Sequence, residues 1–139
     1  MGTTKTLIGL DVGERRIGVA QGDTSVRLAF PYGTLDVDGS ELSKIQSLTK
    51  EVGASTIVVG YPRNQQGEAT QQTTYVQNFI EKLRAVDGFD ANVELQDESL
   101  TSVIAEQRLI AHKKPYTKAD IDAQAAVIIL QDFIGERYG

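Results

Sequence analysis

Short apolar runs alternate with amphipathic segments along this chain, and their order restricts the fold more than any single motif does. Residues 6–11 form an apolar run that ends in an acid, as a buried central strand does. Turn residues separate this run from strand patterns at 16–21 and 27–35, which predicts three adjacent antiparallel strands. Pro31 within the third pattern predicts an edge strand or an irregular one.

The remaining segments alternate between helix and strand. Helices are predicted over about 40–52, from about Val76 to Val86, after Glu98, and from Asp120 to about Tyr138, with strands at 56–60 and 92–96 and a loop at 61–68. Ser40 is expected to cap the first helix and Gly53 to end it. The order predicts an α/β fold with a mixed five-stranded sheet, three antiparallel strands then two parallel, and helices on both faces.

Composition sets the broad class of the protein. With 139 residues, 40% of them hydrophobic, the chain is expected to form one domain over residues 1–139. The absence of cysteine excludes disulfides and thiolate metal sites, so any metal would have oxygen ligands. No signal-type region or membrane-length apolar run is present, which predicts a cytoplasmic protein with no membrane partner. The net charge of −5 argues against a broad basic surface, so contacts to phosphate would be local.

Acidic residues fall where α/β folds build their sites. Asp11 ends the first strand, and Asp97 with Glu98 ends the fifth, so all three lie at carboxyl ends of strands. On the last helix, Asp122 shares a face with the apolar residues, whereas Asp120 is expected to be a solvent-side N-cap. A carboxylate on an apolar face needs a metal, a cation or helix-terminal amides. Small residues nearby would let this end of the helix lie close against the sheet: Ala123, Ala125 and Ala126.

Grouped carboxylates suit phosphodiester chemistry. They are the hard ligands that Mg²⁺ and Mn²⁺ prefer, and two such ions can activate water and stabilise the leaving oxygen. Each acid also has an ordinary structural role: Asp11 as a turn former, Glu98 as a helix N-terminal acid and Asp120 as a cap. The acids at the two strand ends and Asp122, taken together, indicate a metal-assisted hydrolase.

Four ordered motifs resemble those of a known family. They are Leu10-Asp11-Val12-Gly13 with Arg16-Ile17-Gly18-Val19-Ala20, Val59-Gly60-Tyr61-Pro62 with Asn64 and Gly67, residues 97–102, and residues 120–126 with 128–130. Together they look like the motifs of the YqgF/RuvX family, whose members are described as Holliday-junction-resolvase-like and, provisionally, as nucleases that mature small-subunit ribosomal RNA. The resemblance covers nearly the whole chain.

The resemblance implies a ribonuclease H-like fold and a set of site residues. Asp11, Glu98 and Asp122 match the catalytic acids and metal ligands, with Mg²⁺ or Mn²⁺ as cofactor. Arg16 would contact phosphate, with a surface ion pair as the alternative. Asp97 stays an alternative to Glu98, because a strand covered on both faces does not show which neighbour points at the site.

Two lysines are expected to add nucleic-acid contacts. Lys113 and Lys114 lie in the polar segment before the last helix, which is equally well a solvated linker. The chain departs from the family at Ser99, where the family has an arginine that could bind phosphate through two hydrogen bonds. Weaker binding of substrate is expected from this change.

The function expected is that of a metal-dependent endonuclease that acts on nucleic acid, with the 5′ end of pre-16S rRNA favoured. Two alternatives stay open: a Holliday-junction resolvase acting on branched DNA, and a non-catalytic RNA-binding factor in ribosome assembly or transcription. Residues 9–13 also look like the phosphate loop of actin-like and sugar-kinase ATPases, but those proteins need two such domains. The choice between RNA and DNA, one metal or two, and monomer or homodimer is open at this stage.

Overall fold

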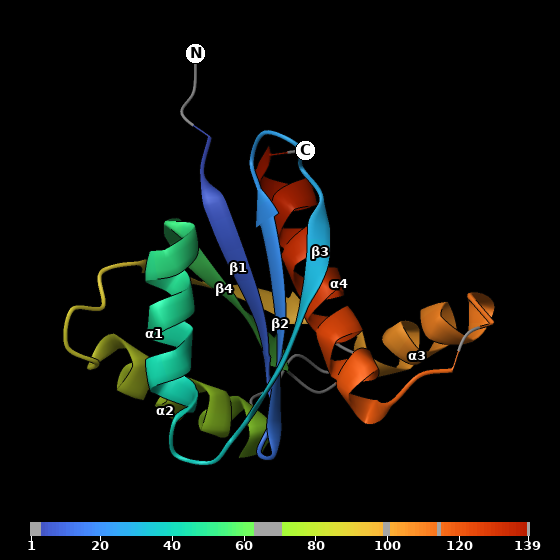
Figure 1. Cartoon of the computed structure of the whole chain (residues 1–139), viewed down its shortest axis with the longest axis horizontal. Helices are drawn as coiled ribbons and strands as arrows, with labels where there is room; N and C mark the ends of the chain where they lie inside the picture. The colour runs from blue at the N-terminus through green and yellow to red at the C-terminus, as the bar shows by residue number, and fades with distance from the viewer. Residues whose placement is uncertain (1–3, 63–70, 99–100, 114, 139) are drawn as a thin grey trace.

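The elements of the computed structural model follow the predicted order (Figure 1). The structure describes residues 4–62, 71–98, 101–113 and 115–138. The strands are β1 (Thr6–Val12), β2 (Arg16–Asp23), β3 (Ala29–Asp36), β4 (Ala54–Pro62) and β5 (Asn92–Glu98). The helices are α1 (Glu41–Val52), α2 (Gln71–Arg84), α3 (Thr101–Ala111) and α4 (Lys118–Tyr138).

The strands form one mixed sheet in the order β3-β2-β1-β4-β5. The pairs β1–β2 and β2–β3 are antiparallel, whereas β1–β4 and β4–β5 are parallel, which confirms the predicted sheet. β3 lies at an edge, and its register against β2 shifts between Val19 and Ala20, where Pro31 pairs, as predicted for this strand.

β4 is longer than predicted, which corrects the expected loop at 61–68. Tyr61 and Pro62 belong to the strand because they pair with Asp97 and Glu98 of β5. Pairing with a neighbouring strand is a tertiary effect that the local Pro62 signal does not contain. The rest of the expected loop, residues 63–68, lies outside the described residues.

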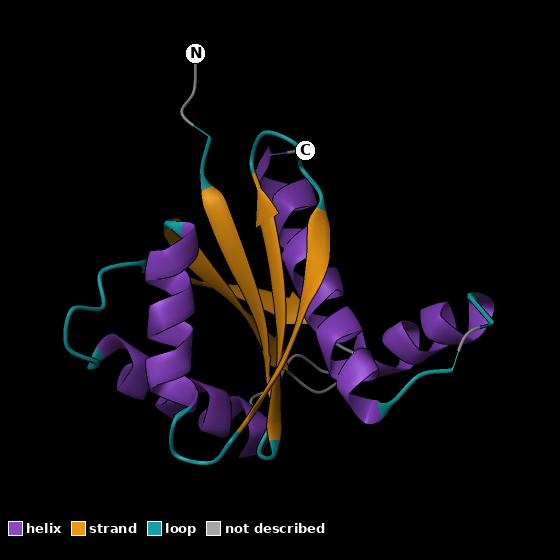
Figure 2. Ribbon diagram, viewed as in Figure 1, coloured by secondary structure: helices purple, strands orange, loops and turns teal. Residues whose placement is uncertain are grey.

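Helices cover both faces of the sheet (Figure 2). One core cluster joins α1 and α2 to alternate residues of the central strands, including Ile8, Leu10 and Val12 of β1. The second cluster joins α4 to the opposite face, where Leu7 of β1 packs. α3 contacts α4 through a small cluster formed by Ala105, Ala125, Ile128 and Ile121. The predicted arrangement of helices on both faces is therefore confirmed.

The ends of α1 and α4 refine the sequence prediction. Gly53 ends α1 with a left-handed backbone, φ 67°, as expected. Ser40 lies at the N-cap position but makes no side-chain cap, because its hydroxyl donates to Asp38 instead. α4 begins at Lys118 rather than at Asp120. Among the described helices, none has the length and apolarity needed to cross a membrane.

Candidate active site

Asp11 lies on the face of the sheet that α4 covers. Side chains alternate along a strand, so Asp11 shares a face with Leu7 and Gly9, and Leu7 packs in the α4 cluster. Its partner across the antiparallel pair is Gly18 of β2, which therefore points to the same face. Asp11 is half-buried near the carboxyl end of β1. The predicted location of this acid at a strand end is confirmed.

Glycines let α4 lie directly on the sheet beside Asp11. A Cβ atom added at Gly18 would lie 1.9 Å from the backbone oxygen of Asp122. One added at Gly9 would lie 2.7 Å from Leu130 Cβ and 3.1 Å from the oxygen of Ala126. Because Gly18 is the cross-strand neighbour of Asp11, the first turns of α4 bring Asp122 next to Asp11. The sequence prediction that Asp122 faces the sheet is confirmed.

The two carboxylates affect each other electrostatically. The pKa of Asp11 is raised from 3.8 to about 6, first because burial disfavours the charged carboxylate and second because the charge of Asp122 repels it. A half-buried pair of like charges is costly unless a cation balances it. Carboxylate oxygens are suitable ligands for Mg²⁺ or Mn²⁺, so Asp11 and Asp122 fit a divalent metal by chemistry and placement.

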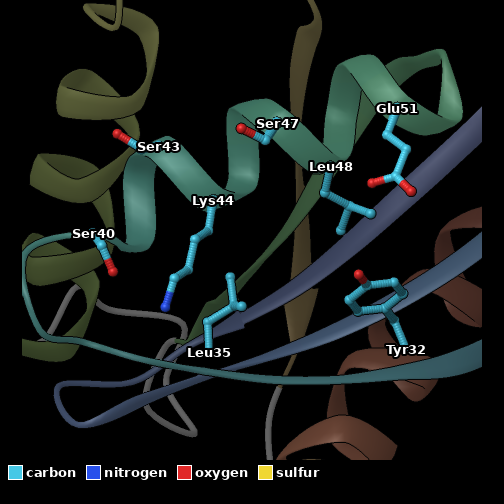
Figure 3. A pocket seen from close by; sticks show the side chains of 8 residues that line it. All are labelled: Tyr32, Leu35, Ser40, Ser43, Lys44, Ser47, Leu48 and Glu51. Atoms are coloured by element: carbon cyan, nitrogen blue, oxygen red, sulfur yellow. The ribbon is translucent and has the colours of Figure 1, made fainter.

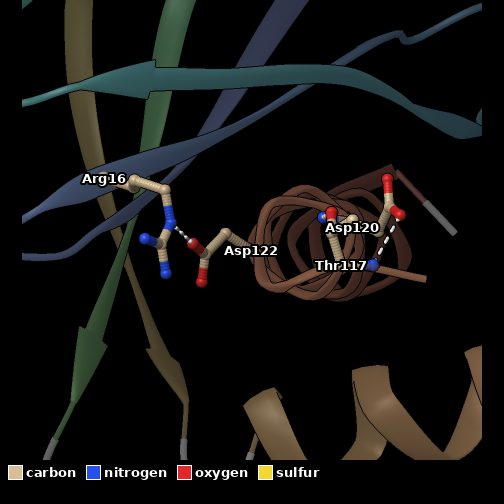
Figure 4. Close-up of polar contacts among 4 residues, drawn as sticks. All are labelled: Arg16, Thr117, Asp120 and Asp122. Carbon is tan, nitrogen blue, oxygen red and sulfur yellow. Dashed lines mark hydrogen bonds and ion pairs between the residues drawn. The ribbon is translucent and has the colours of Figure 1, made fainter.

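Arg16 supplies the positive charge in this structure (Figure 4). Its Nε donates to Oδ2 of Asp122 at 2.8 Å, and the two side chains are 31% and 23% exposed. Arg16 lies on β2 two positions from Gly18, on the same face, so it reaches the first turns of α4. The ion pair that the sequence offered as the alternative role of Arg16 is therefore present. Its partner is Asp122, which the sequence did not indicate. A contact between Arg16 and phosphate stays a prediction.

A reciprocal cap holds the N-terminus of α4. The backbone N–H of Thr117 donates to Oδ2 of Asp120 at 2.9 Å, and the N–H of Asp120 donates to Oγ1 of Thr117 at 3.2 Å (Figure 4). Asp120 is exposed, as predicted, but the N-cap is Thr117, with Asp120 as the third helical residue. Asp120 and Asp122 point to different sides of the helix in Figure 4. The cap therefore orders the turn that carries Asp122.

The end of β5 bears on the choice between Asp97 and Glu98. Gln96 is buried and donates to Glu136 of α4 at 3.1 Å, so this position faces α4. Side chains alternate along β5, so Asp97 lies on the other face of the sheet from Gln96. This is the face of Val93, which packs against the core cluster on the α1 side. The side chain of Glu98 lies outside the part of the chain that is described. Within that part, no three acidic or histidine side chains form a group able to hold a metal.

Of the three cations predicted to bind nucleic acid, Arg16 lies beside the pair of acids, whereas the two lysines do not join it in the part of the chain that is described. Lys113 is exposed just beyond α3, with a left-handed φ of 57°, and Figure 1 shows α3 leading away from the sheet. Lys114 and Ser99 are not among the described residues. The roles expected for Lys113 and Lys114 therefore stay predictions.

A separate pocket of about 330 Å³ lies between β3 and α1 (Figure 3). Tyr32 and Leu35 of β3 face Lys44 and Leu48 of α1 across it. Leu35 and Leu48 belong to the core cluster on the α1 side of the sheet, opposite the face that holds Asp11. The pocket contains no residue that the sequence predicted for the site.

Gly18 is the positioning residue that sequence reasoning missed. It belongs to the motif at residues 16–20, and the alternation of side chains along β2 places it on the same face as Arg16. The signal was a glycine inside a strand pattern, which often marks the close approach of another backbone. That approach is the one made by Asp122.

Comparison with known sequences places the chain in a family. Residues 5–136 match the family model described as RuvX, Holliday junction resolvase. A protein of Chloroflexus aggregans, provisionally named pre-16S rRNA nuclease, is 43% identical over 137 residues, which cover 96% of this chain and 95% of that protein. A protein of Salinibacter ruber with the same provisional name is 36% identical over 132 residues, covering 92% and 91% respectively.

Solved structures support the same fold. The structure of T. thermophilus RuvC in complex with a Holliday junction substrate has a TM-score of 0.58 at 13% identity and covers 96% of this chain and 95% of that one. The complex of Fowlpox virus resolvase with Holliday junction DNA has a TM-score of 0.57 at 9% identity, covering 94% and 97%. The predicted ribonuclease H-like fold is confirmed, and the sequence match over residues 5–136 shows that this chain belongs to the RuvX family.

Proposed function

We propose that this protein is a metal-dependent endonuclease that hydrolyses phosphodiester bonds in nucleic acid, and that its substrate is the 5′ end of the pre-16S rRNA. The observation that carries the proposal is the half-buried pair formed by Asp11 and Asp122, whose two negative charges the single charge of Arg16 balances only in part. Membership of the RuvX family and the provisional names of the relatives support a nuclease.

Each acid has a part in the proposed site. Asp11 and Asp122 hold Mg²⁺ or Mn²⁺, and Glu98 completes the coordination. Glu98 is preferred over Asp97 because Gln96, two positions earlier on β5, faces α4, and strand side chains alternate. When bound, the metal would activate water and neutralise charge on the phosphate.

The cations have a separate part in substrate binding. Arg16 is placed next to Asp122 and would orient the phosphate that is cut. Lys113 would contact phosphates further along the nucleic-acid strand from an exposed position, and we propose the same role for Lys114. Local contacts of this kind are consistent with a chain whose net charge is −5.

The test compares cleavage of an end-labelled pre-16S rRNA precursor and of a synthetic four-way DNA junction, with Mg²⁺ or Mn²⁺ and with chelator. We expect the precursor to be cut near its 5′ end only with metal. Asp11→Asn is expected to lower the rate by about a hundredfold or more, because it removes a ligand that the other acids cannot replace. Asp132→Asn is the matched control, since Asp132 is exposed on α4, the same helix that carries Asp122.

Other outcomes select the alternatives. Cleavage of the junction alone would make the protein a resolvase acting on branched DNA, which the family description and the structural relatives favour. A resolvase would also need two sites related by a two-fold axis, so the protein would be a homodimer rather than a monomer. Failure to cut either substrate, with metal shown to bind, would favour a non-catalytic RNA-binding assembly factor. Processing of ribosomal RNA would place the protein in the cytoplasm.

A further inference from the structure

We propose that Arg16 is a placeholder cation, which holds Asp122 beside Asp11 until a divalent metal binds and then moves from Asp122 to a phosphate of the nucleic acid. This inference rests on the function proposed above, because it needs the metal site formed by these two acids. It adds a coupling to that function: metal binding would strengthen the binding of substrate.

The ion pair is built into the fold rather than formed by two free surface chains. Arg16 and Asp122 are both partly buried, and Nε lies 2.8 Å from Oδ2. Gly18 leaves room for the backbone of α4 to touch β2 at Asp122, so the carboxylate arrives within reach of the strand that carries Arg16. The pair joins residues that are 106 positions apart in the chain.

Competition follows from the chemistry of the two groups. A guanidinium only donates hydrogen bonds, and Oδ2 of Asp122, which accepts from Arg16, is an oxygen that a metal would use as a ligand. A divalent ion would balance both Asp11 and Asp122, whereas Arg16 carries a single charge and, among the described residues, is paired with Asp122. The metal is therefore expected to displace Arg16.

Release of Arg16 has a consequence for substrate. While Nε of Arg16 donates to Asp122, a phosphate and that carboxylate compete for this donor, and the ion pair holds the guanidinium away from a two-bond contact to phosphate. Because linked equilibria are reciprocal, a metal that frees Arg16 would raise the affinity for nucleic acid, and nucleic acid would raise the affinity for metal by the same factor.

The first experiment measures Mn²⁺ affinity by isothermal titration calorimetry. The proposal predicts that Arg16→Gln binds Mn²⁺ about fivefold more tightly than the wild type, the change that corresponds to loss of a partly exposed ion pair. Arg15→Gln removes the same charge from the neighbouring exposed residue, and we expect a change below about twofold because water and salt screen it. Unchanged or weaker binding by Arg16→Gln would show that Arg16 and the metal do not compete for Asp122.

The second experiment works without metal and does not depend on the folding of the Arg16 variant. A fluorescein-labelled fragment of pre-16S rRNA is titrated with protein in chelator and followed by anisotropy. Asp122→Asn is expected to bind the strand about fivefold more tightly than the wild type, because it frees Arg16. Asp132→Asn removes an equal charge from the same helix and is the control. Equal affinities for the two variants would overturn the proposal.

The cleavage assay separates failure of this inference from failure of the proposed function. If Asp11→Asn abolishes cutting but Arg16→Gln does not tighten Mn²⁺ binding, the nuclease proposal stands and the placeholder role is wrong. If the wild type binds neither Mn²⁺ nor Mg²⁺ and cuts neither substrate, both are contradicted.

Discussion

At the scale of single residues, the charge of Asp11 is predicted to weaken the fold of the metal-free protein. Because its pKa is about 6 in the folded protein and 3.8 as the ordinary value, the folded state binds the proton more tightly. The contribution of Asp11 to stability therefore falls as the pH rises from about 4 through 6. At pH 8 we expect Asp11→Asn to be more stable than the wild type by about 1–3 kcal/mol.

Urea unfolding in chelator at pH 8 and pH 5 measures this effect. The advantage of Asp11→Asn should narrow at pH 5, where most of Asp11 in the folded wild type is protonated. Asp132→Asn, which removes the same charge at an exposed position of α4, is the matched control. If Asp11→Asn is instead the less stable protein at pH 8, the carboxylate is held by favourable contacts and the site does not need a cation.

Gly18 is predicted to be the glycine of the site that tolerates a methyl group least. The added Cβ would lie 1.9 Å from the backbone oxygen of Asp122, and the helix backbone cannot move without lifting α4 from the sheet. At Gly60 the nearest atom, at 2.4 Å, is Cδ1 of Ile129, the end of a flexible side chain. We expect Gly18→Ala to cost about 3 kcal/mol and Gly60→Ala about 1 kcal/mol.

The same pair of variants also tests how Asp122 is positioned. Gly18→Ala should reduce cleavage more than its loss of stability explains, since it displaces Asp122 relative to Asp11, whereas Gly60→Ala should not. Urea unfolding and single-turnover cleavage below the unfolding transition give both quantities. Equal stability and equal cleavage for the two variants would mean that α4 does not need to touch β2 at Gly18.

At the scale of elements, the cap of α4 is predicted to be stronger than that of α1. Thr117 and Asp120 bond reciprocally at the start of α4, whereas Ser40 at the start of α1 caps no helix N–H. We expect Thr117→Ala to lower the free energy of unfolding by about 1 kcal/mol, and Ser40→Ala to change it by under about 0.5 kcal/mol.

The position of the cap links it to the site. Fraying of the first turn of α4 would release Asp122, which lies two residues after Asp120. Cleavage by Thr117→Ala should therefore fall at temperatures where the rest of the protein is still folded, and amide hydrogen exchange at residues 118–121 should rise. An unchanged exchange rate there would mean that the contact with Gly18 alone holds this turn.

At the scale of the whole molecule, the sequence was sufficient to predict the order of elements and the sides of the last helix on which Asp120 and Asp122 lie. The strand at residues 6–11 and the helical face of Asp122 were readable because period-two and period-3.6 patterns are local. The pairing of Arg16 with Asp122 could not be predicted from such local patterns, because these residues are 106 positions apart and meet only in the folded protein. Tyr61 and Pro62 were assigned to a loop for the same reason: their strand character comes from pairing with β5.

The last prediction concerns the coupling of the metal to the fold. Asp11 comes from the first strand and Asp122 from the last helix, so a metal held by both would link the two ends of the chain. A ligand that binds only the folded state at a hundred times its dissociation constant adds about 2.7 kcal/mol, which for a domain of this size raises Tm by roughly 10 °C. We expect this rise for Mg²⁺ or Mn²⁺ with the wild type and with Asp132→Asn, and little of it with Asp11→Asn. Differential scanning calorimetry at constant ionic strength measures it, and an equal rise in Asp11→Asn would place the metal away from the pair formed by Asp11 and Asp122.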